Sequence, residues 1–182
     1  MEVVPTPAFD EAYLQECEDA FNQQIERNLS ASYALLSMSS YFKREDVGLL
    51  NFAGYFFHLS VSELGYAENL MTVQVQRGRQ IQFSNNLNFE EQDWDDPLYA
   101  LEYICQVKQQ SFADFMSLYL AATEQGDQAL SYLVNIHLLQ HLIRDIMLLR
   151  YHLTRLFFWQ SEDIPLAEYN FSFLDENVND QE

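Results

Sequence analysis

The chain has few of the residues that make turns. Of its 182 residues, 5 are glycine and 4 are proline. A β-rich fold of this size would need more turn residues, so long helices are favoured. The sequence is 48% hydrophobic, which excludes an intrinsically disordered chain, and its length suits one domain with a full core.

Basic residues are also scarce. Nine Lys and Arg face 28 Asp and Glu, for a formal net charge of -19. Nucleic acid is therefore excluded as a direct partner, because phosphate binding needs clustered basic side chains. The acidic residues gather in 2–19, 90–102 and 162–182. These runs indicate solvated surface, or alternatively a surface that attracts cations or a basic partner.

Cysteine is scarce as well, and the sequence shows neither a signal-peptide pattern nor a long apolar run. Cys17 and Cys105 are too few for a disulfide framework. The N-terminus has neither a basic nor an apolar segment typical of a signal peptide. No uncharged apolar run reaches the ~20 residues of a membrane span. We therefore expect a reduced, cytoplasmic setting without a membrane partner.

Apolar residues spaced by three and four predict four long helices. We expect them over residues 10–42, 47–77, from 95–97 to about 125, and 127–159, with a short fifth helix over 166–174. Residues 78–94 lack a helical period and should form a long crossover between the second and third helices. The predicted fold is an all-α four-helix bundle. We expect a flexible arm at 1–9, the domain at 10–176 and an acidic tail at 177–182.

Several stretches then carry a family resemblance. They are ASYALLSMSSYFKREDVGLLNFAGYFFHLS (31–60), AENLMTVQVQRGRQI (67–81), DW (93–94) and PLAEY (165–169). They resemble animal ferritin heavy and light chains, over nearly the whole chain. The resemblance implies a bundle of ferritin-like connectivity and a hollow shell of 24 subunits. It also implies that heavy-type subunits oxidise Fe(II) at a di-iron centre, which light-type subunits lack.

The resemblance further locates the positions of that centre, and most of them have lost their ligands. Heavy chains use a Glu from the first helix, Glu-x-x-His from the second and a Glu from the third, assisted by a second Glu, a Gln and a Tyr. The matching residues here are, in chain order, Asn28, Leu35, Ser62, Glu63, Tyr66, Lys108 and Leu142. Only Glu63 remains, so the sequence predicts no iron-oxidising enzyme and no metal bound at this site.

Lys108 would stand where the metal must lie. A buried ammonium needs a partner, and Glu63 has the same need with opposite sign. We therefore predict a buried ion cluster of Glu63, Lys108 and Asp145, since Asp145 lies one turn beyond Leu142. The alternative is that Lys108 reaches past the bundle edge to water.

Other positions that the family uses are altered as well. The three-fold channel carboxylates correspond to Tyr132 and Asn135, which carry no charge to concentrate a dication. At the four-fold contact the matching residues are Asn170 and Leu174. The carboxylates that nucleate mineral in light-type chains are fewer here, because Gly65 replaces one of them.

Two further patterns remain open. His137 and His141, four residues apart, could bind a divalent ion, although interface histidines are the plainer interpretation. Phe157, Phe158 and Trp159 form an aromatic cluster that suits either a core or subunit contact or a dedicated partner surface.

These observations leave three hypotheses. The first is a non-catalytic shell subunit, assembled alone or with catalytic heavy-type chains, in which iron mineral is expected only in a mixed shell. The second is a structural or interaction protein of ferritin fold with no iron role. The third is a metal binder or enzyme with rebuilt chemistry at Glu63, Asp145, His137 and His141.

Overall fold

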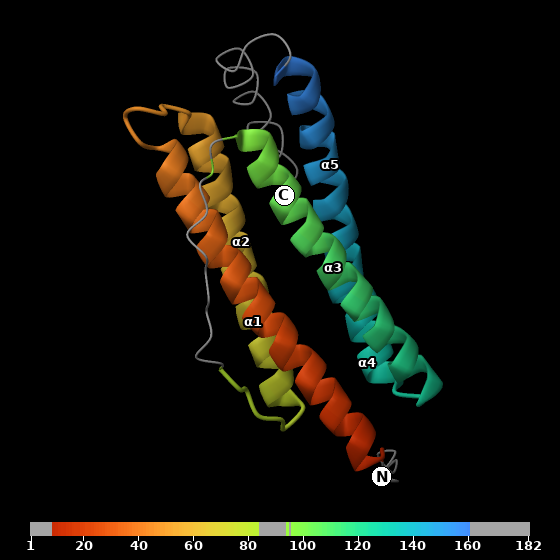
Figure 1. The fold of residues 1–182 in the computed structure, drawn as a ribbon. Coiled ribbons are helices and arrows are strands. Elements are labelled where there is room, and N and C mark those ends of the chain that lie inside the picture. Colours follow the sequence, from red (N-terminus) through yellow and green to blue (C-terminus); the bar gives the residue numbers. More distant parts are fainter. Residues whose placement is uncertain (1–8, 84–93, 95, 161–182) are drawn as a thin grey trace.

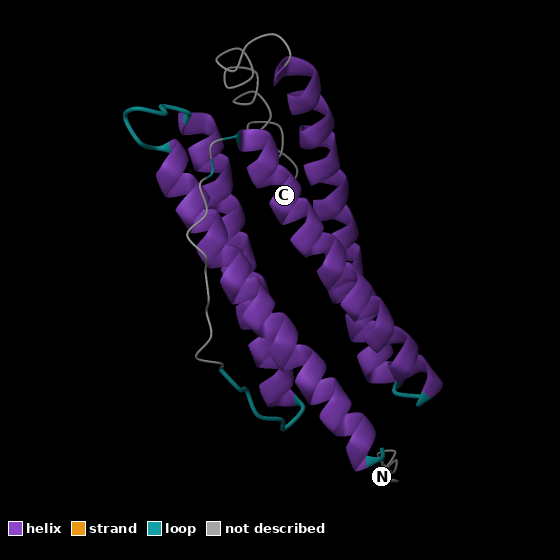
Figure 2. Cartoon of the chain, in the orientation of Figure 1, coloured by secondary structure: helices purple, strands orange, loops and turns teal. Residues whose placement is uncertain are grey.

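The chain folds into long antiparallel helices that form a four-helix bundle (Figures 1 and 2). The structure, a computed structural model, describes residues 9–83, 94 and 96–160. The helical segments are α1 (Glu11–Phe42), α2 (Leu50–Gln76), α3 (Pro97–Glu124), α4 (Gln128–Leu133), η1 (Val134–Leu139) and α5 (Gln140–Gln160). No strand occurs within these described ranges. The prediction of an all-α bundle is confirmed.

Side-chain caps and a glycine set three of the helix ends. The Asp10 carboxylate accepts a hydrogen bond from the Ala12 backbone N–H, and the Asp96 carboxylate accepts one from that of Leu98. Pro97 opens α3, where its missing N–H leaves no bond unmade. Gly126 ends the α3 turn with φ 72°, a left-handed conformation that glycine adopts freely. The start predicted for the third helix is confirmed.

The fourth helix differs from its prediction, because it is not regular along its length. The six residues Val134–Leu139 form a π-helical stretch between α4 and α5. At its end the Gln140 N–H reaches back to the Asn135 carbonyl, one residue further than in an α-helix. Neither glycine nor proline occurs in this stretch, so the sequence carries no signal for it.

The crossover follows α2 as predicted, as far as the structure describes it. Residues 78–83 are not helical apart from a turn at Gly78, and Trp94 is 1% exposed near the start of α3. The Trp94 indole N–H donates to the Ser37 hydroxyl of α1 at 3.3 Å. The predicted fifth helix, the acidic tail and most of the N-terminal arm lie outside the described residues.

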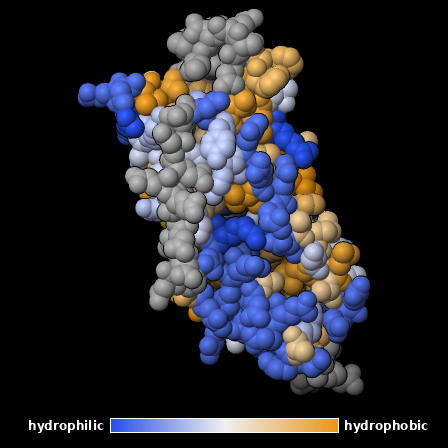
Figure 3. Space-filling model, in the orientation of Figure 1, coloured by the Kyte–Doolittle hydropathy of each residue, from blue (hydrophilic) through white to orange (hydrophobic). Residues whose placement is uncertain are grey.

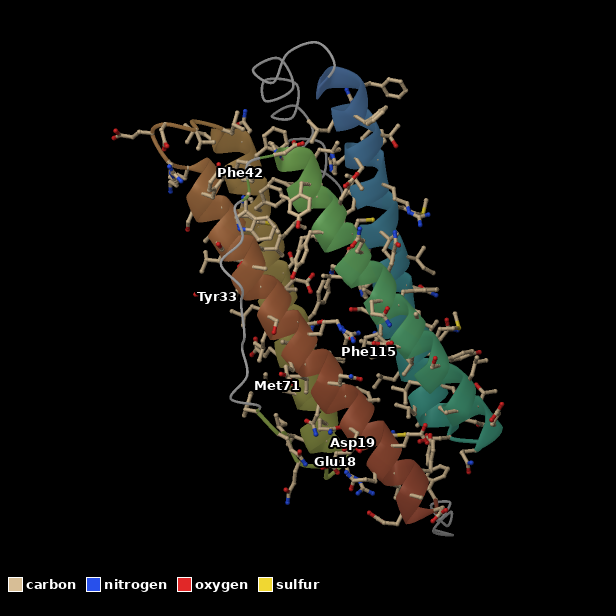
Figure 4. All side chains as sticks on the ribbon, in the orientation of Figure 1. Glu18, Asp19, Tyr33, Phe42, Met71 and Phe115 are labelled. Atoms are coloured by element: carbon tan, nitrogen blue, oxygen red, sulfur yellow. The ribbon has the colours of Figure 1, made fainter. Side chains whose placement is uncertain are left out.

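The apolar core is divided into two clusters at different levels of the bundle. One contains Phe42 and Phe56, and the other contains Phe21 and Phe115. Figure 4 labels Phe42 and Phe115 at these two levels. Buried polar and charged side chains lie between the clusters: Gln24, Asn28, Glu63, Lys108 and Ser111. This polar layer is the candidate site.

Asp127 ties the turn between α3 and α4 to the first two helices. Its carboxylate caps α4 by accepting the Leu130 N–H at 2.9 Å. It also pairs with Arg77 at 2.8 Å and accepts the Tyr13 hydroxyl at 3.2 Å. Asp127 is 3% exposed, so these contacts replace its hydration.

Replacing Asp127 by alanine is expected to lower the free energy of unfolding by about 3 kcal/mol. The cap contributes ~1 kcal/mol and a hydrogen bond to a charged group ~1.5–3 kcal/mol. Guanidinium unfolding measures the change. Asp127→Asn is the control, since it keeps a capping oxygen and should lose clearly less than the alanine variant. Equal losses in the two variants would contradict the capping role.

Candidate functional site: a buried ion cluster in the bundle

Three helical segments bring one cation and two carboxylates together in the polar layer. Glu63 comes from α2, Lys108 from α3 and Asp145 from α5. The Lys108 ammonium contacts a Glu63 carboxylate oxygen and lies 2.9 Å from an Asp145 carboxylate oxygen. The structure thus places both carboxylates of the predicted cluster in contact with Lys108.

Two of the three members of the cluster, Glu63 and Lys108, are shielded from water. Glu63 is 3% exposed and Lys108 is 4% exposed, so Lys108 does not extend to solvent. Burial raises the pKa of Glu63, and the nearby Lys108 ammonium only partly offsets this effect. Burial opposes the charged form of Lys108, but the Glu63 and Asp145 carboxylates outweigh it and raise the pKa of Lys108. The ammonium therefore stays charged in the core.

Tyr66 completes the surroundings of the ammonium. The Lys108 Nζ lies 4.7 Å from the centre of the Tyr66 ring, within cation–π distance. Burial, followed by the charge of Asp145, raises the pKa of Tyr66 to about 12, so its hydroxyl is neutral. The residue at the family's histidine position thus faces a cation and cannot act as an anionic ligand near neutral pH.

An amide and hydroxyl network occupies the α1 side of the site. The Gln24 amide N–H donates to the Asn28 side-chain oxygen at 2.6 Å and to the Ser111 hydroxyl at 2.9 Å. Sequence reasoning missed Gln24 and Ser111. The only available signal was the spacing of Gln24 and Asn28 by four, which places them on one helix face.

The seven positions matched to the heavy-chain centre do not all meet. Those lining a common cavity of about 480 Å³ are Asn28, Glu63, Tyr66, Lys108 and Leu142. Leu35 is fully buried in one of the apolar clusters. Ser62 is exposed, and its hydroxyl donates to the His58 carbonyl one turn earlier.

The residues present do not fit a di-iron centre. Such a centre needs several oxygen or nitrogen ligands converging from facing helices. Here the Lys108 ammonium stands between the two carboxylates that could contribute. An ammonium has only donors and a positive charge, so it repels a metal dication from this position.

The other candidate residues lie on the fourth helix or beyond the described part of the chain. Tyr132, Asn135 and His137 are exposed, and the half-buried His141 contacts Arg144 through its ring nitrogen. Among the residues described, no three His, Cys, Asp or Glu side chains lie close enough together to hold a metal ion. Asn170, Leu174 and the Trp159 side chain lie outside the described residues.

The fourth helix leaves much apolar surface uncovered. Figure 3 shows hydrophobic groups gathered along the side of α4 and α5. Exposed large side chains on these segments include Tyr132, Met147, Tyr151, Phe157 and Phe158. No helix in the described part of the chain is both long and apolar enough to cross a membrane.

The bundle, its crossover and its polar layer at the di-iron positions define the class of a ferritin-like helical protein. A family model described as "Ferritin-like domain" matches residues 18–157, which is most of the chain. The chain therefore belongs to the ferritin family of iron-storage-type proteins.

Proposed function

We propose that this protein is a non-catalytic shell subunit of the ferritin family, which assembles alone or with catalytic heavy-type chains. The position of the Lys108 ammonium carries the proposal. It contacts Glu63 and Asp145 where the family's oxidising subunits hold iron. The protein then forms part of the shell without oxidising iron. In a mixed shell, iron is oxidised at the di-iron centres of the heavy-type subunits.

The uncovered apolar surface of the fourth helix supports an assembled state. Met147 is 67% exposed and Tyr132 is 64% exposed, and both belong to the last long helix of the bundle. Large contiguous apolar patches are uncommon on monomers and mark contact surfaces. We propose that neighbouring subunits cover this surface in the shell.

Co-expression with a heavy-type ferritin subunit tests the assembly. The expected result is hollow particles that contain both chains, seen by sizing, electron microscopy and mass spectrometry of the purified particles. The protein alone should form particles of the same size. Recovery of monomers alone, with no mixed particles, would contradict a role as shell subunit.

The second candidate is a structural protein of ferritin fold without an iron role. The aromatic end of α5 favours it, because Phe157 is 66% exposed and Phe158 is 67% exposed. Exposed aromatic pairs suit binding of another protein. Particles smaller than a ferritin shell, or a filament, in the same experiment would support this candidate.

A further inference from the structure

The cavity beside the ion cluster has the size and lining of a small-molecule site. Its volume of about 480 Å³ falls in the range of pockets that hold small organic ligands. The wall is mainly apolar and includes Leu70, Phe115, Leu138 and Leu142. An apolar body fits such a wall, because its transfer out of water is favourable.

The ionic groups of the polar layer disfavour a charged ligand. The Lys108 ammonium already lies between the Glu63 and Asp145 carboxylates, so a second cation would be repelled from the same place. An anion would meet the one net negative charge of these three groups. The formal net charge of -19 for the whole chain opposes an anion as well. The charges around the cavity therefore favour a neutral ligand.

Asn28 provides a hydrogen-bond donor at the buried end of the cavity. It lines the cavity from α1 and is 7% exposed. Its side-chain oxygen accepts from the Gln24 amide at 2.6 Å, but among the hydrogen bonds of the described residues its own amide N–H groups donate none. A buried amide donor without an acceptor costs free energy, and an oxygen atom of a ligand would remove that cost.

The other donors of the lining are already bonded or can reach water. Gln24 uses both of its amide N–H groups, since it donates to Ser111 as well as to Asn28. Asn69 and His137 are exposed and mark the mouth of the cavity between α2 and the fourth helix, so water can bind them. Asn28 is therefore the donor that a ligand inside the cavity would meet.

We propose that the cavity binds a neutral lipophilic molecule with an acceptor oxygen, such as an aryl ketone. Its apolar body packs against Leu70 and Phe115, and its oxygen accepts a hydrogen bond from the Asn28 amide. This binding depends neither on shell assembly nor on iron. It gives the protein a small-molecule site beside the position at which its catalytic relatives hold metal.

Equilibrium dialysis of the purified protein with 2-acetylnaphthalene, a neutral two-ring ketone, tests the proposal. Three matched probes keep the naphthalene ring: 2-naphthoate carries a negative charge, 1-(2-naphthyl)ethylammonium carries a positive charge, and 2-ethylnaphthalene lacks the oxygen. We expect saturable binding of one ketone per subunit. Both charged probes should bind at least tenfold more weakly than the ketone, because the cavity would have to take up an unpaired charge.

The variant Asn28→Leu tests the hydrogen bond. It removes the donor and keeps a side chain of similar size. Binding of the ketone should weaken about fivefold or more, whereas 2-ethylnaphthalene should bind as tightly as before or more tightly, because only the ketone loses a hydrogen bond. Binding of the hydrocarbon also shows that the cavity of the variant is intact. Equal weakening of both probes would contradict the role of Asn28.

Two further variants locate the site. Asn69→Trp should block the mouth and abolish binding of the ketone, whereas Val75→Trp should not. Val75 lies on the same helix, is 61% exposed and does not line the cavity. Both changes replace exposed side chains, so they decide the location even if Asn28→Leu folds poorly. Absence of saturable ketone binding, equally tight binding of a charged probe, or ketone binding unaffected by Asn69→Trp would overturn the proposal.

Discussion

Replacing Lys108 by alanine is expected to lower the free energy of unfolding by about 3–5 kcal/mol, because it leaves a buried carboxylate without its cation. Glu63 is 3% exposed and cannot regain water where it lies. Removing one partner of a buried ion pair is far more destabilising than never having the pair. For a chain of this length the loss corresponds to a fall of roughly 10 °C in the midpoint of thermal unfolding.

The matched control replaces both members of the pair. Glu63→Leu with Lys108→Met fills similar volume and removes both charges, so its stability should return to that of the unaltered protein or exceed it. Asp145 remains, but its side chain is 23% exposed and can be hydrated. A loss under about 1 kcal/mol for Lys108→Ala, which is the size expected of a surface pair, would contradict a buried cluster.

The alanine variant should also depend on pH in a defined direction. Burial raises the pKa of Glu63 above its ordinary value of 4.5, and loss of the Lys108 charge raises it further. Because the folded-state pKa is the higher one, protonation favours the folded state. The stability gap between the variant and the unaltered protein should therefore narrow as the pH falls from 8 towards 5, measured by thermal unfolding at each pH.

Restoring the ligands of the heavy-chain centre is expected to restore iron oxidation. The variant carries Asn28→Glu, Ser62→Glu, Tyr66→His, Lys108→Glu and Leu142→Gln. Except for Ser62, these positions line one cavity, so the new oxygen and nitrogen atoms can converge. Aerobic Fe(II) oxidation should rise by at least ~10-fold over the unaltered protein, since even outer-shell groups at metal sites contribute that much.

A second variant isolates the contribution of Lys108. It carries the same changes except at position 108, and it should remain inactive because the ammonium still repels the metal. A measurement of metal binding that needs no iron oxidation separates loss of the site from misfolding. Zn²⁺ should raise the midpoint of thermal unfolding of the variant with all five substitutions, but not that of the variant that keeps Lys108. Equal oxidation by both variants would show that Lys108 is not the obstacle.

The helices and the ion cluster could be predicted from the sequence. The helices follow from local patterns, and the cluster follows from positions matched to the ferritin family. Asp96 and Pro97 are residues typical of a helix N-terminus and predict the start of α3. The spacing of apolar residues by three and four predicts which face of each helix is buried. Lys108 lies on an apolar stripe, so its ammonium needs an anionic partner. Comparison with the positions of the heavy-chain centre indicated Glu63 and Asp145 as partners. The contacts between these three side chains follow from that demand.

The π-helical stretch and the cavity could not be predicted in this way. A single extra residue in a turn changes no composition and needs no glycine or proline, so Val134–Leu139 reads as ordinary helix. The cavity depends on how α2 and the fourth helix pack, which is a property of pairs of helices. The Tyr66 ring beside Lys108 is likewise a contact across helices.

Aerobic addition of Fe(II) to the purified, unaltered protein tests the central claim most directly. Oxidation is followed by the absorbance of the ferric product and by oxygen consumption, against buffer and a heavy-type ferritin. We predict the rate of buffer alone, because Lys108 holds the place of the metal between Glu63 and Asp145. Rapid oxidation of about two Fe(II) per subunit, as a di-iron centre would give, would contradict the account.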